Sequence, residues 1–276
     1  MTGRKAIFLD VDGTYAHHGV APAAHEAAVR DLRAAGHRVL LCTGRPKSML
    51  SAKLLAPGFD GVVAAAGGYV EFDGEVLADR RFPADVAARV VSVLDGHGVA
   101  YVLEAPERVY GPLGVDVRLE NLLAGLFPST GDGAQKGRLD ILDALEMSAD
   151  LSAASFGKVS CFGSPVPVSE LALEIGPGIG VIASSLAGMD GSAGELYQLG
   201  VHKAVGIQAV VEHLGIARED VVAVGDGLND VEMLAYAGVG VAIDGAHPDV
   251  VAVADFLTPG PGDAGLVAAF GKLGLL

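Results

Sequence analysis

Short apolar runs alternate with longer amphipathic stretches in the first part of the chain. Apolar runs that end in polar residues or glycine predict strands, and stretches with apolar residues on one side predict helices. The predicted strands are residues 5–9, 38–42 and 61–65, and the predicted helices are residues 22–35 and 46–55. Strands and helices that alternate in this way form a parallel sheet covered by helices on both faces.

The last part of the chain resumes the same alternation. It predicts strands at 221–224 and 239–243, and helices at 202–214, 231–236 and about 264–273. In the first of these helices the apolar residues fall at i, i+3, i+4 and i+7, which gives one buried face. These residues are Ile207, Val210, Val211 and Leu214.

A middle region with its own set of predicted strands and helices separates the two parts. It predicts strands at 100–104, 157–162 and 180–184, and helices at 86–95 and 168–175. An insertion of this size can form a domain of its own. We therefore predict an α/β protein with a doubly wound, Rossmann-like parallel sheet core at residues 1–82 and 194–276, and an inserted α/β domain at residues 83–193.

Composition narrows the possible partners. The chain has 276 residues, of which 51% are hydrophobic, and 19 Lys and Arg against 34 Asp and Glu give a net charge of −15. Such an acidic chain is a poor partner for nucleic acid or anionic lipid. No segment has the pattern of a signal peptide or a membrane span, so we expect a cytoplasmic protein with no nucleic-acid or membrane partner.

Two acidic motifs directly follow apolar runs. They are Asp10-Val11-Asp12-Gly13-Thr14 after the first predicted strand and Gly225-Asp226-Gly227-Leu228-Asn229-Asp230 after strand 221–224. The carboxyl ends of parallel strands meet at one edge of the sheet, and Asp10 and Asp12, two residues apart, are expected to point the same way. Carboxylates that face one another repel unless a cation lies between them, and oxygen ligands favour Mg²⁺. The alternative is that each Asp-Gly step only forms a turn.

Two further segments could contact a phosphate. Thr43-Gly44-Arg45 ends strand 38–42, where a hydroxyl and a backbone N–H can meet an anion. Lys203 lies at the start of a predicted helix, where a cation opposes the helix dipole unless an anion accompanies it. A plain turn with a solvated arginine, and a solvated lysine, are the alternatives for these two segments.

Taken in order, the four segments resemble the motifs of the haloacid dehalogenase-like phosphatase superfamily. The resemblance implies that Asp10 is the nucleophile and Asp12 the general acid and base. It also implies that Thr43 and Lys203 bind the phosphate, and that Gly44, Arg45 and Asn229 contact the substrate. The Mg²⁺ site would comprise Asp10, the Asp12 carbonyl and Asp226, with Asp230 in a supporting position.

The position of the insertion narrows the resemblance to one branch. Asp10 and Thr43 are only 33 residues apart, whereas Thr43 and Lys203 are 160 apart, so a cap domain fits only between the second and third motifs. This arrangement resembles the Cof-type branch. The chain departs from that branch at Ala66-Gly67-Gly68, where the family often has Asn-Gly-Ala, and at Ala204, where it often has Gly.

The resemblance implies a Mg²⁺-dependent phosphatase that hydrolyses small phosphorylated metabolites, such as sugar phosphates, through an aspartyl-phosphate. A phosphosugar mutase with the same nucleophile is one alternative, and a non-catalytic metabolite-binding protein is another. The sequence predicts neither the physiological substrate nor the oligomeric state.

Overall fold

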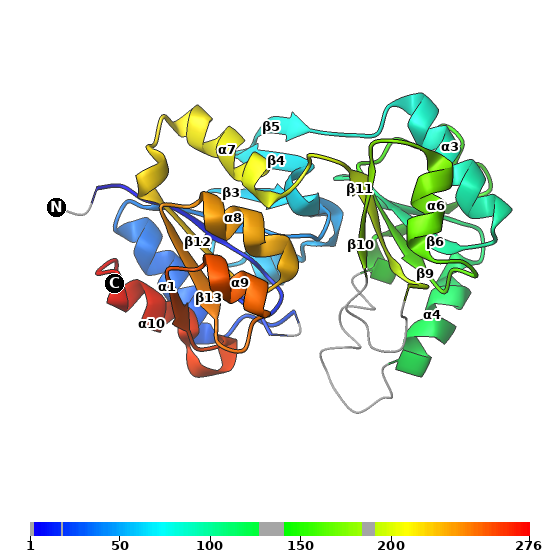
Figure 1. Ribbon diagram of the computed structural model, residues 1–276. Helices are drawn as coiled ribbons and strands as arrows, with labels where there is room; N and C mark the ends of the chain where they lie inside the picture. The colour runs from blue at the N-terminus through cyan, green and yellow to red at the C-terminus, as the bar shows by residue number, and fades with distance from the viewer. Residues whose placement is uncertain (1–2, 18, 127–140, 184–190) are drawn as a thin grey trace. The chain divides into compact units, whose positions relative to one another are not determined.

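The structure is a computed structural model that describes residues 3–17, 19–126, 141–183 and 191–276 (Figure 1). The chain divides into two compact units. The core unit comprises Met1–Arg45, Leu50–Asp79 and His202–Leu276, and the inserted unit comprises Pro46–Met49 and Arg80–Val201. Parts of the predicted cap domain, residues 127–140 and 184–190, lie outside the described residues, as does the last residue of the predicted strand 180–184.

Within its described residues, the core unit contains an eight-stranded sheet in the order β14-β13-β12-β1-β2-β3-β4-β5. Neighbouring strands from β14 to β3 run parallel, and β4 and β5 are antiparallel additions. The strands are β1 (Ala6–Leu9), β2 (Arg38–Cys42), β3 (Gly61–Ala64), β4 (Tyr69–Phe72), β5 (Glu75–Asp79), β12 (Val221–Gly225), β13 (Val239–Ile243) and β14 (Phe256–Thr258). Asp73 and Gly74, with φ of 47° and 80°, form the hairpin turn between β4 and β5.

Helices cover both faces of this sheet (Figure 1). Ile7 and Leu9 pack in one cluster with side chains of α1 (Ala23–Ala34) and α10 (Gly265–Lys272). Ala6 and Phe8 pack in the opposite cluster with side chains of the helices α7 (Lys203–Leu214), α8 (Val231–Tyr236) and α9 (Pro248–Val253). Because alternate residues of β1 serve the two clusters, the strand is buried on both faces. The predicted α/β fold with a doubly wound core is confirmed.

The predicted helix at 46–55 is wrong in its extent. The chain forms a short 3₁₀ turn at Lys47–Met49 and a separate helix α2 at Ala52–Leu55. Ser51 is extended, and its side chain accepts a hydrogen bond from the Leu54 N–H at 3.3 Å. This N-cap begins a new helix, because a capping residue has non-helical backbone angles.

The inserted unit has, within its described residues, a six-stranded sheet in the order β10-β11-β9-β6-β7-β8. Its helices α3 (Ala84–Gly96) and α6 (Val168–Ile175) pack on one face of this sheet. The strands are β6 (Ala100–Glu104), β7 (Val109–Pro112), β8 (Leu145–Ser148), β9 (Lys158–Phe162), β10 (Ile179–Ala183) and β11 (Gly194–Gln198), and a further helix is α4 (Val115–Leu126). This unit extends to Val201 because β11 pairs with β9 and β10. None of the helices in the described ranges combines the length and the apolar character that crossing a membrane requires.

Candidate active site

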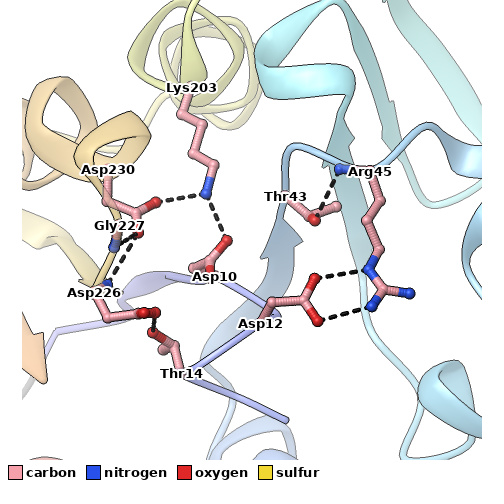
Figure 2. Close-up of polar contacts among 9 residues, drawn as sticks. All are labelled: Asp10, Asp12, Thr14, Thr43, Arg45, Lys203, Asp226, Gly227 and Asp230. Carbon is pink, nitrogen blue, oxygen red and sulfur yellow. Dashed lines mark hydrogen bonds and ion pairs between the residues drawn. The ribbon is translucent and has the colours of Figure 1, made fainter. Parts of the chain in front are cut away.

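The first acidic motif begins where β1 ends. Asp10 follows Leu9, is 6% exposed, and its backbone N–H donates to the Val224 carbonyl of the neighbouring strand β12. The chain then turns through Gly13, which has φ +91°. Asp10 and Asp12 were expected to point the same way, but β1 has ended before Asp12, and the two side chains contact different residues. Asp10 points toward Lys203, and Asp12 points toward Arg45 (Figure 2).

The second acidic motif begins where β12 ends, beside β1 in the sheet. Asp230 is fully buried, and its Oδ2 accepts the backbone N–H groups of Asp226 at 3.0 Å and Gly227 at 2.8 Å. Its Oδ1 accepts Lys203 Nζ at 2.5 Å. Both oxygens of Asp230 thus accept hydrogen bonds from protein groups, which fits a residue that supports the metal site without binding the metal directly. Asp226 Oδ1 accepts the Thr14 hydroxyl at 2.7 Å, which ties the two acidic motifs together.

Lys203 is the first residue of α7 and is fully buried. Its Nζ also donates to Asp10 Oδ1 at 2.5 Å, so one ammonium bridges the two acidic motifs (Figure 2). Glycines let α7 come this close. A Cβ on Gly206 would lie 2.4 Å from a methyl of Val63, and one on Gly67 would lie 2.2 Å from the His202 carbonyl. Burial alone would lower the pKa of Lys203, but the charges of Asp10 and Asp230 raise it above its usual value.

Lys203 supplies one positive charge to a cluster of three carboxylates, Asp10, Asp226 and Asp230. Oxygens of Asp10, Asp226 and Asp230 all lie within 4.8 Å of one another. Burial raises the pKa of Asp10 well above its usual value, against the opposing effect of Lys203. Burial also raises the pKa of Asp226, with Asp230 adding to it. A cluster of three carboxylates, two of them buried, beside a single ammonium fits a divalent cation such as Mg²⁺, which Asp10 and Asp226 would hold.

Asp12 and Arg45 form a bidentate ion pair. Arg45 Nε donates to Asp12 Oδ2, and Arg45 Nη2 donates to Asp12 Oδ1, each at 2.7 Å. The Asp12 side chain is half exposed. The predicted substrate-binding arginine therefore contacts the predicted acid and base, and both oxygens of Asp12 are engaged. For Asp12 to act on a substrate, at least one of these bonds has to be exchanged.

Thr43 is buried at the end of β2, and its Oγ1 accepts the Arg45 N–H at 3.1 Å. The loop after β3 supports this turn, because the Ala66 N–H donates to the Thr43 carbonyl at 2.9 Å and the Ala65 N–H to the Arg45 carbonyl at 2.8 Å. Ala65 and Ala66 both have positive φ, 47° and 51°. At Ala66 the family often has Asn, which tolerates this conformation better than Ala does.

Asn229, a residue of the second acidic motif, lies beside Gly44, since a Cβ on Gly44 would come within 3.3 Å of the Asn229 amide nitrogen. The predicted site residues thus gather at the carboxyl ends of three adjacent parallel strands, β12, β1 and β2. Thr14 was missed as a site residue. Its place in the first acidic motif was visible in the sequence, but its bond to Asp226 depends on the approach of a segment 212 residues away.

Comparisons with known proteins identify the family of the chain. A model of the haloacid dehalogenase-like hydrolase family matches residues 7–135 and 150–270. YkrA of Bacillus subtilis (strain 168), provisionally named a phosphatase, is 27% identical over 99% of this chain and 98% of its own. A phosphoglycolate phosphatase of Archaeoglobus fulgidus is 28% identical over 99% of this chain and 98% of its own.

Solved structures show the same fold. The crystal structure of a hypothetical protein from Geobacillus kaustophilus HTA426 has a TM-score of 0.83 at 27% identity, and the match covers 99% of this chain and 100% of the other. The family model covers most of the sequence, including all four motifs. The chain therefore belongs to the haloacid dehalogenase-like hydrolases, as its motifs predicted.

Proposed function

We propose that this hydrolase is a Mg²⁺-dependent phosphatase that acts on small phosphorylated metabolites, such as sugar phosphates, through an aspartyl-phosphate on Asp10. Phosphatase activity is supported by the family and by the names of the two relatives described above, one of which is named for phosphoglycolate. The observation that carries the proposal is the bridge from Lys203 Nζ to Asp10 and Asp230, with an oxygen of Asp226 in the same cluster.

In the proposed reaction a carboxylate oxygen of Asp10 attacks phosphorus, and the bond from phosphorus to the leaving oxygen breaks. Asp12 donates a proton to that oxygen and then accepts one from the water that attacks the phosphorylated Asp10. The bond between Asp10 and phosphorus breaks, and inorganic phosphate leaves. The geometry supports this division of roles, because Asp10 is buried and held at Oδ1 by Lys203, whereas Asp12 is half exposed.

The other residues bind and orient the phosphoryl group. The Thr43 hydroxyl, the Gly44 backbone and Asn229 lie at the carboxyl ends of neighbouring strands, and Lys203 contributes positive charge. Bound Mg²⁺ would neutralise charge that develops on the phosphoryl oxygens. Thr14 orients Asp226 through its hydroxyl. The backbone N–H groups of Asp226 and Gly227 donate to the Asp230 carboxylate, and these bonds fix the loop that carries Asp226 and Asp230.

Selection among substrates belongs, in this proposal, to the cap domain predicted at residues 83–193. All of the phosphate-handling residues named above lie in the core unit. A site that recognises only a phosphoryl group accepts many phosphate esters, so residues elsewhere must distinguish their leaving groups.

A phosphate-release screen tests the proposal. Sugar phosphates, phosphoglycolate and an activated aryl phosphate are incubated with the protein in Mg²⁺ or in EDTA, and inorganic phosphate is measured. We expect release from at least one ester in Mg²⁺, and none in EDTA or with Asp10→Asn. Asp31→Asn, at an exposed position of α1, is the matched control and should keep wild-type activity. If no ester gives Mg²⁺-dependent release above the Asp10→Asn background, the proposal is wrong.

A further inference from the structure

A buried histidine lies behind the first acidic motif. His25, near the start of α1, is fully buried. Its Nδ1 lies 3.0 Å from the Tyr15 carbonyl, and its Nε2 lies 3.2 Å from the Leu266 N–H in the first turn of α10. The ring also stacks on Tyr15, with centroids 6.5 Å apart and planes inclined by 25°. One side chain therefore joins the acidic-motif loop, α1 and α10.

The two hydrogen bonds define which ring nitrogen carries the proton. The Leu266 N–H can only donate, so Nε2 must accept and carry no proton. Nδ1 must then carry the proton and donate it to the Tyr15 carbonyl. The neutral imidazole with its proton on Nδ1 is the form that satisfies both partners.

The Tyr15 carbonyl is an anchor point for the loop that carries Asp12 and Thr14. Within this loop the Tyr15 N–H donates to the Asp10 carbonyl at 3.0 Å, and the Ala16 N–H donates to the Val11 carbonyl at 2.8 Å. These bonds close the loop on itself, and Thr14 connects it to Asp226. A shift of Tyr15 would therefore move Asp12 and Thr14 relative to the second acidic motif.

We propose that His25 is a positioning residue, which acts through the Tyr15 carbonyl to hold Asp12 and Thr14 in their places opposite Asp10 and Asp226. The kinetic part of this inference rests on the proposed phosphatase function. Thr43 and Lys203 are held by other elements, so loss of His25 should slow the chemical step more than it weakens substrate binding. Displacement of catalytic groups by about 1 Å can cost on the order of 100-fold in rate.

A second buried histidine in the same unit provides a matched control. His37 is 6% exposed, and its Nδ1 accepts the Lys5 N–H at 3.1 Å. Lys5 precedes β1, so His37 supports the end of the strand opposite to Asp10. Loss of His37 should reduce stability without affecting the acidic-motif loop.

The experiment compares His25→Phe, His25→Gln and His37→Phe with the wild type. Phe retains an aromatic ring but neither hydrogen bond, whereas the Gln amide carries a donor group, its NH₂, and an acceptor, its carbonyl oxygen. For His25→Phe we expect kcat on the best ester to fall at least about tenfold, with KM changed less than about threefold. His25→Gln should recover most of kcat, and His37→Phe should keep the wild-type kcat.

Hydrogen exchange gives a readout that does not depend on activity. Amides in residues 11–17 should exchange at least about tenfold faster in His25→Phe than in the wild type or His37→Phe, because their closed loop loses its anchor. If His25→Phe does not fold, His25→Asn takes its place, since its shorter amide reaches only one of the two partners.

The two readouts separate the possible failures. A wild type without phosphatase activity would overturn the proposed function, and the exchange rates would still decide the role of His25. A folded His25→Phe protein with wild-type exchange in residues 11–17 would overturn the positioning role. Equal loss of kcat in His25→Phe and His37→Phe would also overturn it, because the effect would then be general destabilisation.

Discussion

Gly13 allows a test of how tightly the two acidic motifs fit together. It has φ +91°, and a Cβ at this position would lie 2.3 Å from Asp226 Oδ2. Ordinary contacts of a Cβ begin near 3.4 Å, so in Gly13→Ala the Asp226 carboxylate must move by about 1 Å, on the scale that costs on the order of 100-fold in rate. The movement would also strain the bond from Thr14 to Asp226.

Gly36 supplies the control, because it has the same φ of +91° and no atom within 4 Å of its would-be Cβ. Both substitutions should lower the free energy of unfolding by about 1–2 kcal/mol from backbone strain, measured by urea denaturation. Only Gly13→Ala should lower kcat, by on the order of 100-fold, and reduce the stabilisation that Mg²⁺ gives. Equal kcat values for the two variants would refute the close fit of Gly13 against Asp226.

Three other predictions follow from burial and backbone geometry. Asp10→Asn should keep less than about 1% of wild-type turnover, while its melting temperature without Mg²⁺ should hold or rise, because burial raises the pKa of Asp10; a marked drop would contradict this. Ala66→Gly should raise the free energy of unfolding by up to about 1 kcal/mol in urea denaturation, because Ala66 has φ 51°, and a decrease would count against it. Burial lowers the pKa of His25 below its usual 6.5, so its contribution to stability is fully present above about pH 6.5 and is lost as pH falls from there through the folded-state pKa. His25→Gln should reduce the slope of the free energy of unfolding against pH below about pH 6.5. Some slope should remain, because burial also lowers the pKa of His37. A slope equal to that of the wild type would contradict the neutral state of His25.

The sequence predicted the core strands because buried parallel strands are continuous apolar runs. Strands β2 and β13 have the predicted bounds, and β1 and β12 differ from the prediction by one residue. Strand β11 was missed, because Gly194-Glu195-Leu196-Tyr197-Gln198 has one fully buried apolar residue among polar neighbours. Such a strand takes its stability from its partners β9 and β10, which a local pattern does not reveal.

The candidate residues could be predicted, but their pairings could not. Four motifs in order identified the residues at three strand ends and Lys203 at the start of α7. That Lys203 bridges Asp10 and Asp230, and that Arg45 occupies both oxygens of Asp12, depends on segments 193, 27 and 33 residues apart in sequence. These contacts arise from close packing, such as that of α7 at Gly206, and have no periodic signature in the sequence.

The most direct test of the central claim is to locate the phosphoryl group on the protein. Asp12→Asn, which lacks the base proposed to activate water, is mixed with the activated aryl phosphate and Mg²⁺ and quenched in acid. The protein is then reduced with borohydride, which converts an aspartyl-phosphate to homoserine, and the peptide containing residue 10 is analysed by mass spectrometry. Homoserine at position 10 is the predicted result. Mg²⁺-dependent phosphate release by the wild type, with homoserine absent from position 10 or found at another aspartate, would contradict the account.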